Sequence, residues 1–341
     1  MSITIEELAR IANTSVATVS RVLNNKPGVS EKRRADIKKL AEQFGYSPNI
    51  LARNLVMKKQ HMLGYIVSSL SNPAYIDFFH RIESSCRAQG YQVLIADSEE
   101  NVKLEKQHIK AMLEHRADGL LIFPVADDHS SAGHRHFLDL QLRKVPFVLL
   151  GESGGYNFDY VTSEEIESSG VLARHLLELG HRRIGVVGVL PGNRCTEQRL
   201  EGVTRVLERE SPEAAKILRR ADGEKEDWIP EVCSWFKYPD APTALITMNN
   251  GVALRLYRPL EEVGIEIPRD VSMVSFEDDF WTELIRPSLT TSVPNNAEVA
   301  RLAFETLRER IKDPEAPPIG HHIPQTFIRR ESSGPPRPEQ K

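Results

Sequence analysis

Residues 15–24 carry short hydroxyl and amide side chains and one arginine, at a spacing suited to contacts with nucleic acid. Ser15 can cap a short helix over residues 16–23, whose apolar residues would face inward. The side chains expected to face outward are Val16, Ala17, Thr18, Ser20 and Arg21. Arg21 can bind guanine through both arms of its fork or hold a phosphate. Ser15, Thr18 and Asn24 suit phosphate contacts near helix ends, so this segment is the first candidate site.

Three helices are expected to position that segment. Thr4-Ile5-Glu6-Glu7 has the form of a capping box, and a first helix follows it. Asn13-Thr14 ends this helix, Pro27-Gly28 marks a turn after the second, and Ser30 caps a third. This is the order of a helix-turn-helix DNA-binding headpiece. A small three-helix module that binds protein has the same order, and the architecture alone leaves both open.

Charge is distributed unevenly along the 341 residues. Residues 1–60 contain 11 Lys or Arg against 5 Asp or Glu, and the net charge of the whole chain is −4, so the remainder is near −10. A basic head on an acidic body indicates a polyanionic partner for the head. A merely solvated helical surface is an alternative that charge alone does not exclude.

The headpiece sequence resembles that of the LacI/GalR family of bacterial repressors. The matching positions are Ala9, Ala12, Ser15, Thr18-Val19-Ser20-Arg21-Val22-Leu23-Asn24, Val29-Ser30, Gly45-Tyr46 and Pro48-Asn49. One departure is Asn13, where the family usually has Gly, but Asn tolerates a left-handed turn. The resemblance implies that Val16 and Ala17 help to select the operator and that Ser20, Arg21 and Asn24 contact DNA.

The family's hinge helix is matched by residues 48–55. In the family that helix orders on specific DNA and enters the minor groove beside its dimer mate. Leu55 matches the leucine that wedges between base steps, although on sequence alone it would more often be ordinary helix packing. The DNA contacts that we expect are Thr4, Ser15, Val16, Ala17, Thr18, Ser20, Arg21, Asn24, Asn49, Ala52, Arg53 and Leu55.

From Met62 onward, short apolar segments alternate with segments of helical periodicity. Such alternation indicates parallel sheets with helices on both faces, and two successive series indicate two doubly wound lobes. Residues 62–330 resemble the family's core, through motifs such as LGHRRI at 179–184 and PSLTT at 287–291. That core shares its fold with periplasmic sugar-binding proteins. The predicted fold class is an all-α, lambda-repressor-like headpiece followed by a periplasmic-binding-protein-like α/β core.

The expected boundaries follow from these segments. They are a headpiece at 1–48, a hinge helix and linker at 49–61, an effector-binding and dimerisation core at 62–331, and a disordered tail at 332–341. Within the core we expect an N-terminal lobe at about 62–161 and 290–320, and a C-terminal lobe at about 162–289 and 321–331.

Polar residues beyond the carboxyl ends of the predicted strands are the candidates for a ligand site, because open α/β sheets bind ligands there. The effector contacts that the resemblance implies are Tyr75, Glu164, Thr196, Arg199, Asn249 and Glu277. The fork of Arg199 suits paired hydroxyls or a carboxylate. The alternatives are a surface arginine at Arg199, a helix cap at Asn249 and a core aromatic at Tyr75.

Several positions depart from the family's acidic pattern. Glu277 replaces its usual Asp, and Asn249-Asn250 replaces a common Asn-Asp pair. Gly151 stands at a frequent acidic position, and Glu164 stands where Asp is common. We therefore expect a polyhydroxylated or sugar-acid ligand without assuming a familiar sugar. Cys195 can line the site, but a bystander thiol is the simpler interpretation.

Enzyme motifs are absent from the sequence: it has no nucleophile elbow, HExxH, P-loop or dinucleotide-binding glycine pattern. His129, His134 and His136 lie near Asp127 and Asp128, where a solvated loop is a better interpretation than a metal site. We expect no enzymatic activity, no cofactor and no metal. Cys86, Cys195 and Cys233 are isolated and are expected to be reduced thiols.

No apolar stretch approaches the roughly 20 residues that cross a bilayer, and the N-terminus lacks a signal-peptide core. We therefore expect a cytoplasmic transcription repressor that binds a near-palindromic double-stranded operator as a homodimer, under control of a small sugar-like effector. The tail lacks heptads, so a coiled-coil tetramer is not expected. The alternative is a solute-binding protein for sugar uptake, which would need an export signal and no basic head.

Overall fold

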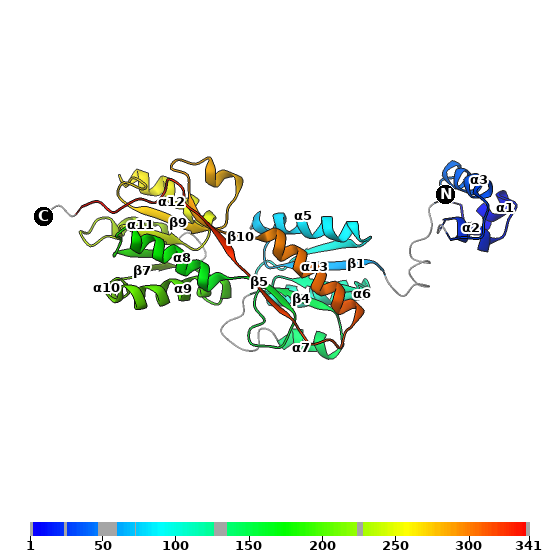
Figure 1. Ribbon diagram of the computed structural model, residues 1–341, viewed down its shortest axis with the longest axis horizontal. Helices are drawn as coiled ribbons and strands as arrows, with labels where there is room; N and C mark the ends of the chain where they lie inside the picture. Colours follow the sequence, from blue (N-terminus) through cyan, green and yellow to red (C-terminus); the bar gives the residue numbers. More distant parts are fainter. Residues whose placement is uncertain are drawn as a thin grey trace. The chain divides into compact units, whose positions relative to one another are not determined.

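The computed structural model describes residues 3–23, 26–46, 60–71, 73–125, 135–223 and 228–338. The chain divides into two compact units, Met1–Gln60 and His61–Lys341 (Figure 1). In its described residues the first unit is helical and the second contains two sheets. This arrangement confirms the predicted fold class.

Three helices make up the described part of the first unit: α1 (Ile5–Ile11), α2 (Val16–Leu23) and α3 (Glu31–Gln43). The predicted capping box is present, because the Glu7 amide donates to Thr4 Oγ1 at 3.2 Å and the Thr4 amide donates to Glu7 Oε2 at 2.8 Å. Asn13 adopts a left-handed φ of +50°, as its place in the turn requires. The buried residues that join the helices are Leu8, Ala9, Ala12, Val19, Val22, Ile37 and Ala41.

Two arginines of α3 hold the ends of the other two helices. Arg33 Nη2 donates to the carbonyl oxygens of Ala12 (2.6 Å) and Asn13 (2.9 Å). Arg34 Nη2 donates to the carbonyl oxygen of Lys26 at 2.7 Å. Carbonyls at a helix C-terminus have no partner within the helix, so these contacts stabilise the turns. Part of the headpiece's positive charge therefore serves its fold.

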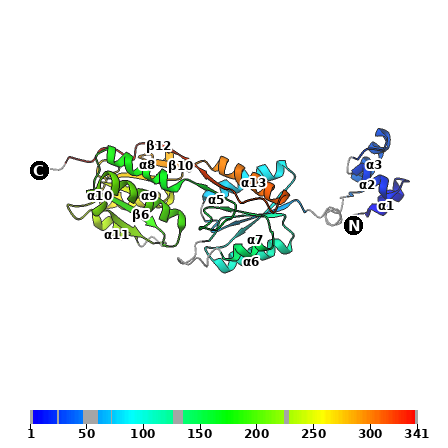
Figure 2. The same cartoon turned by 60° about the horizontal axis from the view of Figure 1, so that its bottom comes forward.

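The N-terminal lobe of the second unit is a six-stranded parallel sheet in the order β11-β5-β4-β3-β1-β2. Its strands are β1 (Met62–Val67), β2 (Gln92–Asp97), β3 (Gly119–Ile122), β4 (Phe147–Leu150), β5 (Tyr160–Ser163) and β11 (Gly320–Ile323). Helices α5 (Pro73–Ala88) and α13 (Asn296–Lys312) cover one face, and α6 (Val102–Glu114) and α7 (Arg135–Leu142) cover the other (Figure 2).

The C-terminal lobe is a second six-stranded sheet, in the order β12-β10-β9-β8-β6-β7, with β12 antiparallel to β10. Its strands are β6 (Ile184–Val189), β7 (Arg219–Asp222), β8 (Ala244–Thr247), β9 (Ser272–Phe276), β10 (Thr290–Pro294) and β12 (Gln325–Ile328). Helices α8 (Glu165–Glu178), α9 (Arg194–Glu210) and α10 (Pro212–Lys216) pack on one face. Helices α11 (Trp228–Trp235) and α12 (Asn250–Glu262) pack on the other, and a short 3-10 turn, η1 (Phe280–Glu283), follows β9.

Burial explains why the central strands read as continuous apolar runs in the sequence. Helices cover both faces of each sheet, so successive side chains of β3, β4, β6, β8 and β9 are all buried. At β12 the covering is less complete, and its residues are half-buried or exposed.

The chain passes between the lobes three times, and the structure corrects the expected lobe boundaries. The connections from β5 to α8, from β10 to α13 and from β11 to β12 each consist of one residue: Glu164, Asn295 and Pro324. β10 was expected in the N-terminal lobe, but it pairs with β9 of the C-terminal sheet. Residues 321–323 were expected in the C-terminal lobe, but β11 pairs with β5.

The expected disordered tail is also wrong for its first residues. Ser332 is fully buried, and its carbonyl oxygen accepts from the Met273 amide at 2.7 Å. The Ser332 hydroxyl donates to the Met273 carbonyl oxygen at 2.6 Å, and Ser333 Oγ lies 2.9 Å from His175 Nε2. The described tail therefore continues the packing of the C-terminal sheet; residues 339–341 lie outside the described part.

Candidate functional site

Arg199 lies at the carboxyl-end edge of the C-terminal sheet, in the first turns of α9. Asn193 begins this helix, because its Oδ1 accepts from the Thr196 amide at 3.1 Å. The Arg199 side chain points inward, and only 4% of it is exposed. This burial rules out the alternative of a surface arginine.

Two carboxylates and one carbonyl surround the Arg199 guanidinium. Arg199 Nε donates to Glu165 Oε2 at 2.6 Å, and Nη1 lies 3.5 Å from Glu277 Oε1. Nη1 also donates to the carbonyl oxygen of Met248, at the end of β8. The guanidinium carbon lies 4.3 Å from the centre of the Phe276 ring, a cation–π contact. Residues from the β5–α8, β8–α12 and β9–η1 junctions thus meet at one arginine.

Close packing of α8 on α9 brings Glu165 within reach of that arginine. A Cβ at Gly202 of α9 would lie 2.1 Å from the backbone oxygen of Ile166 in α8. Glycine is therefore required at this position, since any side chain would push the two helices apart. The buried Glu165–Arg199 ion pair therefore depends on the close contact between α8 and α9.

Glu277 follows β9 directly and has a left-handed φ of +70°. Burial raises the pKa of its carboxyl to about 6; Arg199 opposes this shift, and the charges of Glu165 and Asp279 add to it. At neutral pH the group is mostly ionised, but it gains a proton much more readily than an exposed glutamate.

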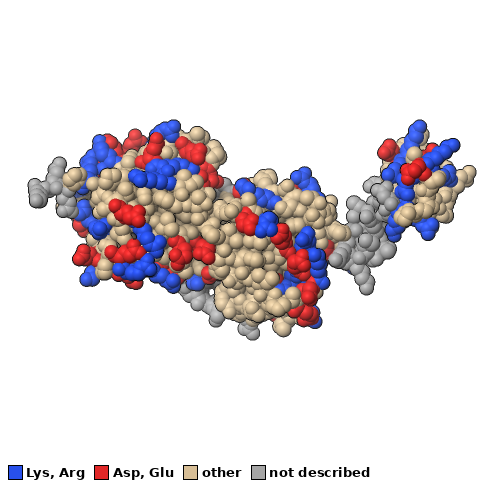
Figure 3. Space-filling view, in the orientation of Figure 1, with Lys and Arg blue, Asp and Glu red and all other residues tan. Residues whose placement is uncertain are grey.

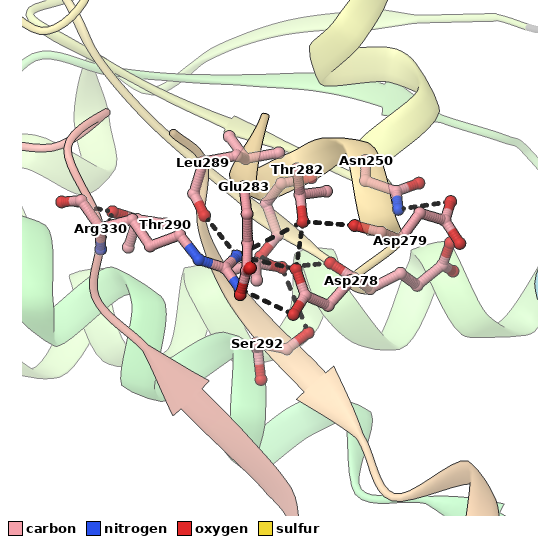
Figure 4. Close-up of polar contacts among 12 residues, drawn as sticks. Asn250, Asp278, Asp279, Thr282, Glu283, Leu289, Thr290, Ser292 and Arg330 are labelled. Atoms are coloured by element: carbon pink, nitrogen blue, oxygen red, sulfur yellow. Dashed lines mark hydrogen bonds and ion pairs between the residues drawn. The ribbon is translucent and has the colours of Figure 1, made fainter. Parts of the chain in front are cut away.

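The segment after Glu277 is held by two further contacts (Figure 4). Arg330, just beyond β12, binds both oxygens of Asp278, at 2.7 and 2.8 Å. Asn250 Nδ2 at the start of α12 donates to Asp279 Oδ2 at 2.9 Å. Bidentate Arg–carboxylate contacts fix geometry as well as charge, so the position of Glu277 is well defined.

Tyr75 comes from the N-terminal lobe, near the start of α5. Its hydroxyl accepts from Ser68 Oγ at 3.1 Å, and its ring centre lies 4.5 Å from that of Phe123. Its pKa is raised by burial, and the Cys195 thiol and the Glu277 carboxylate of the other lobe contribute to the shift. Tyr75 packs against the core of the N-terminal lobe, as its alternative interpretation predicted.

The remaining candidates have structural contacts that account for them. Asn249 Oδ1 accepts from the Val252 amide at 2.8 Å, so Asn249 caps α12 as the alternative predicted. Thr196 is buried, and its hydroxyl donates to the carbonyl oxygens of Leu190 and Asn193, which precede α9. Glu164 forms the β5–α8 connection, and its side chain makes no capping bond.

Sequence reasoning missed Glu165, the strongest partner of Arg199. It considered only Glu164 of the adjacent pair, because that position matched an acidic position of the family. The register of α8 decides which glutamate faces inward, and Glu165 is 8% exposed. It also gave no role to Glu152, which pairs with Arg194 across the lobes at 3.3 Å.

The outer face of α2 is the second candidate surface. Val16, Ala17 and Arg21 are exposed, while Thr18 and Ser20 are half-buried. Ser15 Oγ accepts from the Thr18 amide at 3.2 Å, and the exposed Thr4 caps α1. Lys and Arg side chains lie across the visible face of the headpiece (Figure 3). Asn24 and the hinge candidates Asn49, Ala52, Arg53 and Leu55 lie outside the described residues.

Metal and membrane sites find no support in the described part of the chain. No group of three or more His, Cys, Asp or Glu side chains there is placed to hold a metal ion. His129 and His134 lie outside that part, and His136 pairs with Glu105 at 2.6 Å. No described helix is long and apolar enough to cross a membrane. Cys86, Cys195 and Cys233 are free thiols.

Two family models match the chain. The model described as "Bacterial regulatory proteins, lacI family" matches residues 4–49, and the model of a "Periplasmic binding protein-like domain" matches residues 173–333. The "HTH-type transcriptional repressor PurR" of Aliivibrio salmonicida is 29% identical and covers 91% of this chain and 92% of its own length. A "Ribose operon repressor" of Haemophilus influenzae is 25% identical over 91% of this chain and 92% of its own.

Solved structures share the fold of the whole chain. A lac repressor dimer bound to operator and the anti-inducer ONPF has a TM-score of 0.87 at 22% identity, covering 98% of this chain and 100% of the other. A regulator from Enterococcus faecium with bound ribose has a TM-score of 0.69 at 24% identity, covering 81% and 100%. At these identities the likeness concerns the fold.

Proposed function

The chain belongs to the LacI family of bacterial regulatory proteins, and from that premise we propose that it binds a near-palindromic operator as a homodimer under the control of a small polar effector. It is a DNA-binding transcription repressor and not an enzyme. The observation that carries the proposal is that one chain combines two candidate sites. The first is the exposed face of α2, and the second is the buried Arg199 at the carboxyl-end edge of the C-terminal sheet.

The operator part rests on the headpiece. Val16 and Ala17 open the exposed face of α2, and Arg21 stands one turn further on the same face. A short apolar contact and an arginine fork are the groups that read thymine methyls and guanine edges in a major groove. We assign residues 1–48 as the DNA-binding headpiece and residues 49–61 as hinge helix and linker.

The effector part rests on Arg199, in the first turns of the helix that follows β6, and on Glu277, directly after β9; ligands of such sheets bind beyond the carboxyl ends of the strands. Together they offer a hydrogen-bond donor and an acceptor, the combination that a polyhydroxylated molecule needs. The relative with bound ribose supports a sugar or sugar derivative as the class. Tyr75, Thr196, Asn249 and Glu164 complete the proposed surroundings of that ligand.

The dimer follows from the operator, because a twofold pair of headpieces matches two half-sites related by the same symmetry. The lac repressor neighbour was solved as a dimer on its operator. A repressor that acts on the chromosome works in the cytoplasm, and we propose that location here.

Two variants test operator binding and effector binding separately. Deleting residues 1–57 should abolish binding to the operator selected by the full chain, while effector binding measured by calorimetry stays unchanged. Arg199→Ala in the full chain should do the reverse, since it removes the central donor of the effector site. A thermal-shift screen over sugars, sugar acids and nucleosides would supply the effector. Operator binding by the deleted protein would refute the headpiece assignment.

A further inference from the structure

A guanidinium and two carboxylates are buried together at the proposed effector site. Arg199, Glu165 and Glu277 have side chains that are 4%, 8% and 19% exposed. Their formal charges sum to one negative, because one cation faces two anions. We infer that the effector carries no negative charge and that Glu165 is the residue that sets this preference; the inference rests on the proposed function.

The arginine that would attract an anion is already neutralised. Glu165 Oε2 accepts from Nε at 2.6 Å, the shorter of the two carboxylate contacts of Arg199. Glu277 occupies the other side at 3.5 Å from Nη1. A ligand carboxylate or phosphate would have to displace one of these groups or lie beside both, and a desolvated site penalises either outcome.

Other cations of this region are also paired. Arg194, at the start of the same helix, lies 3.3 Å from Glu152. Arg330 binds Asp278 and Glu283. Asp279 adds a further carboxylate beside Glu277, since its charge helps to raise the pKa of that group. The local field around the proposed ligand is therefore acidic, which disfavours anions and tolerates neutral or cationic molecules.

Neutral hydroxyl groups of a ligand can bind the hydrogen-bonding groups of Arg199 and Glu277 that the protein itself leaves unused. The contacts described above use Nε and Nη1, and Nη2 has no hydrogen-bond partner among the described residues. A ligand hydroxyl can accept from Nη2 and donate to a Glu277 oxygen at once, because a hydroxyl does both. An ionised carboxylate or phosphate group placed there can only accept, so it would gain the contact with Nη2 but would be repelled by the two carboxylates.

Glu165 is a positioning residue in this scheme. Glu165 binds Nε of Arg199 and so orients Nη2. Its negative charge also changes the net charge of the cluster from zero to one negative. Without it, Arg199 and Glu277 alone would balance each other and leave the guanidinium open to an anionic ligand. Glu167, two residues further along α8, is exposed and provides a matched change of charge outside the cluster.

The first measurement uses the full wild-type chain and matched ligand pairs. Thermal shift and calorimetry would compare D-ribose with D-ribose 5-phosphate, D-glucose with D-gluconate and D-glucuronate, and adenosine with its monophosphate. The expected result is that any pair that binds does so through its uncharged member. Preference for an anionic member would overturn the inference while supporting the proposed small-molecule control.

The second measurement compares Glu165→Gln with Glu167→Gln. Glutamine keeps an oxygen for Arg199 Nε but removes the charge, so the anion-to-neutral affinity ratio should rise roughly tenfold or more in the first variant and stay unchanged in the second. Equal ratios in the two variants would overturn the role of Glu165. If Glu165→Gln does not fold, the wild-type ligand pairs still decide the charge class.

Sulfate gives a readout that needs no effector. At matched ionic strength, replacing chloride by sulfate should raise the melting temperature of Glu165→Gln by more than that of Glu167→Gln, because the Arg199 guanidinium has then lost one of its two neutralising carboxylates and binds the anion more strongly. An equal rise in both would count against the inference. A larger rise in Glu165→Gln, with no ligand pair bound by the wild type, would support the charge argument and contradict small-molecule control by these classes.

Discussion

At the scale of single residues, Arg199 serves the fold and the proposed ligand with different nitrogen atoms. Nε and Nη1 contact Glu165, Met248 and Glu277, which ties three parts of the C-terminal lobe together. Buried ion pairs of this kind add little net stability, because both partners lose their hydration. Their value here lies in fixing the direction of the guanidinium.

Effector affinity is expected to depend on pH through Glu277. Its pKa is raised to about 6, so the folded protein holds a proton on this group more tightly than the unfolded chain does. The Glu277 carboxyl is therefore mostly ionised above about pH 6 and mostly protonated below it. If the ionised form accepts the ligand's hydroxyl, affinity measured by calorimetry should fall by up to roughly tenfold per pH unit below that value.

Glu277→Gln provides the control for this prediction. Its amide cannot titrate, so the affinity of the variant should be lower at pH 7 but nearly constant between pH 5 and pH 8. A variant that keeps the wild-type pH profile would show that another group is responsible.

At the scale of secondary-structure elements, the contact between α8 and α9 determines whether the charged cluster can form. Gly202 lets the backbones approach, and the two helices carry Glu165 and Arg199 at the same end. The β5–α8 connection is a single residue, Glu164, so a change in this contact would be transmitted directly to the N-terminal lobe.

Gly202→Ala is expected to disturb this element pair. The new methyl group would lie 2.1 Å from the Ile166 backbone oxygen, which cannot rotate away. Forced separation of packed helices typically costs about 1–3 kcal/mol, measured as the free energy of unfolding in urea. Effector affinity should fall as well, because the Glu165–Arg199 contact lengthens.

Gly170→Ala is a matched change in the same interface. Its methyl group would lie 3.1 Å from Val206 Cγ2, the end of a side chain that can shift. Both substitutions gain the same helix propensity, so only the neighbour differs. Equal losses of stability in the two variants would contradict the role assigned to backbone approach at Gly202.

At the scale of the whole molecule, charge is divided between the two units. The first 60 residues are basic by count and the rest of the chain is acidic, although the total is only −4. Arg33 and Arg34 use part of this charge to hold helix ends, so we propose that phosphate contacts depend on the other cations, such as Arg21. We expect the acidic core to repel DNA and so to limit non-specific binding to the headpiece.

Operator binding should therefore weaken steeply with salt. A dimer that makes about six to ten phosphate contacts loses roughly 10³-fold or more in affinity between about 50 and 200 mM monovalent salt. Fluorescence anisotropy with a labelled operator measures this slope. Effector affinity measured over the same salt range should change little, because a neutral ligand releases no counterions; a shared slope would refute the division of roles between the units.

The headpiece could be predicted almost completely from the sequence. Its caps act between residues three apart, as in Thr4 and Glu7, and its buried positions recur at helical spacing. The left-handed turn at Asn13 was likewise a local property. Such signals depend on neighbours along the chain, so they can be recognised without knowledge of the tertiary structure.

The site in the core could be predicted only in part. Arg199 and Glu277 were identified because the family resemblance implies effector contacts at these positions, but Glu165 was missed in favour of Glu164. The two glutamates are adjacent, and only the packing of α8 on α9 decides which one reaches the arginine. Asn249 and Thr196 proved to have structural contacts that their residue types alone did not distinguish from ligand contacts.

The sequence by itself determined that a basic helix-turn-helix unit precedes a two-lobed α/β core, since helical caps and apolar runs are written into short segments. Only the tertiary structure decided that β10 joins the C-terminal sheet, that β11 and β12 belong to different lobes, and that Ser332 is buried. Those outcomes depend on hydrogen bonds between strands far apart in the chain, such as the Met273–Ser332 contact. Pairing of this kind leaves no periodicity in the strands themselves, which is why local patterns could not reveal it.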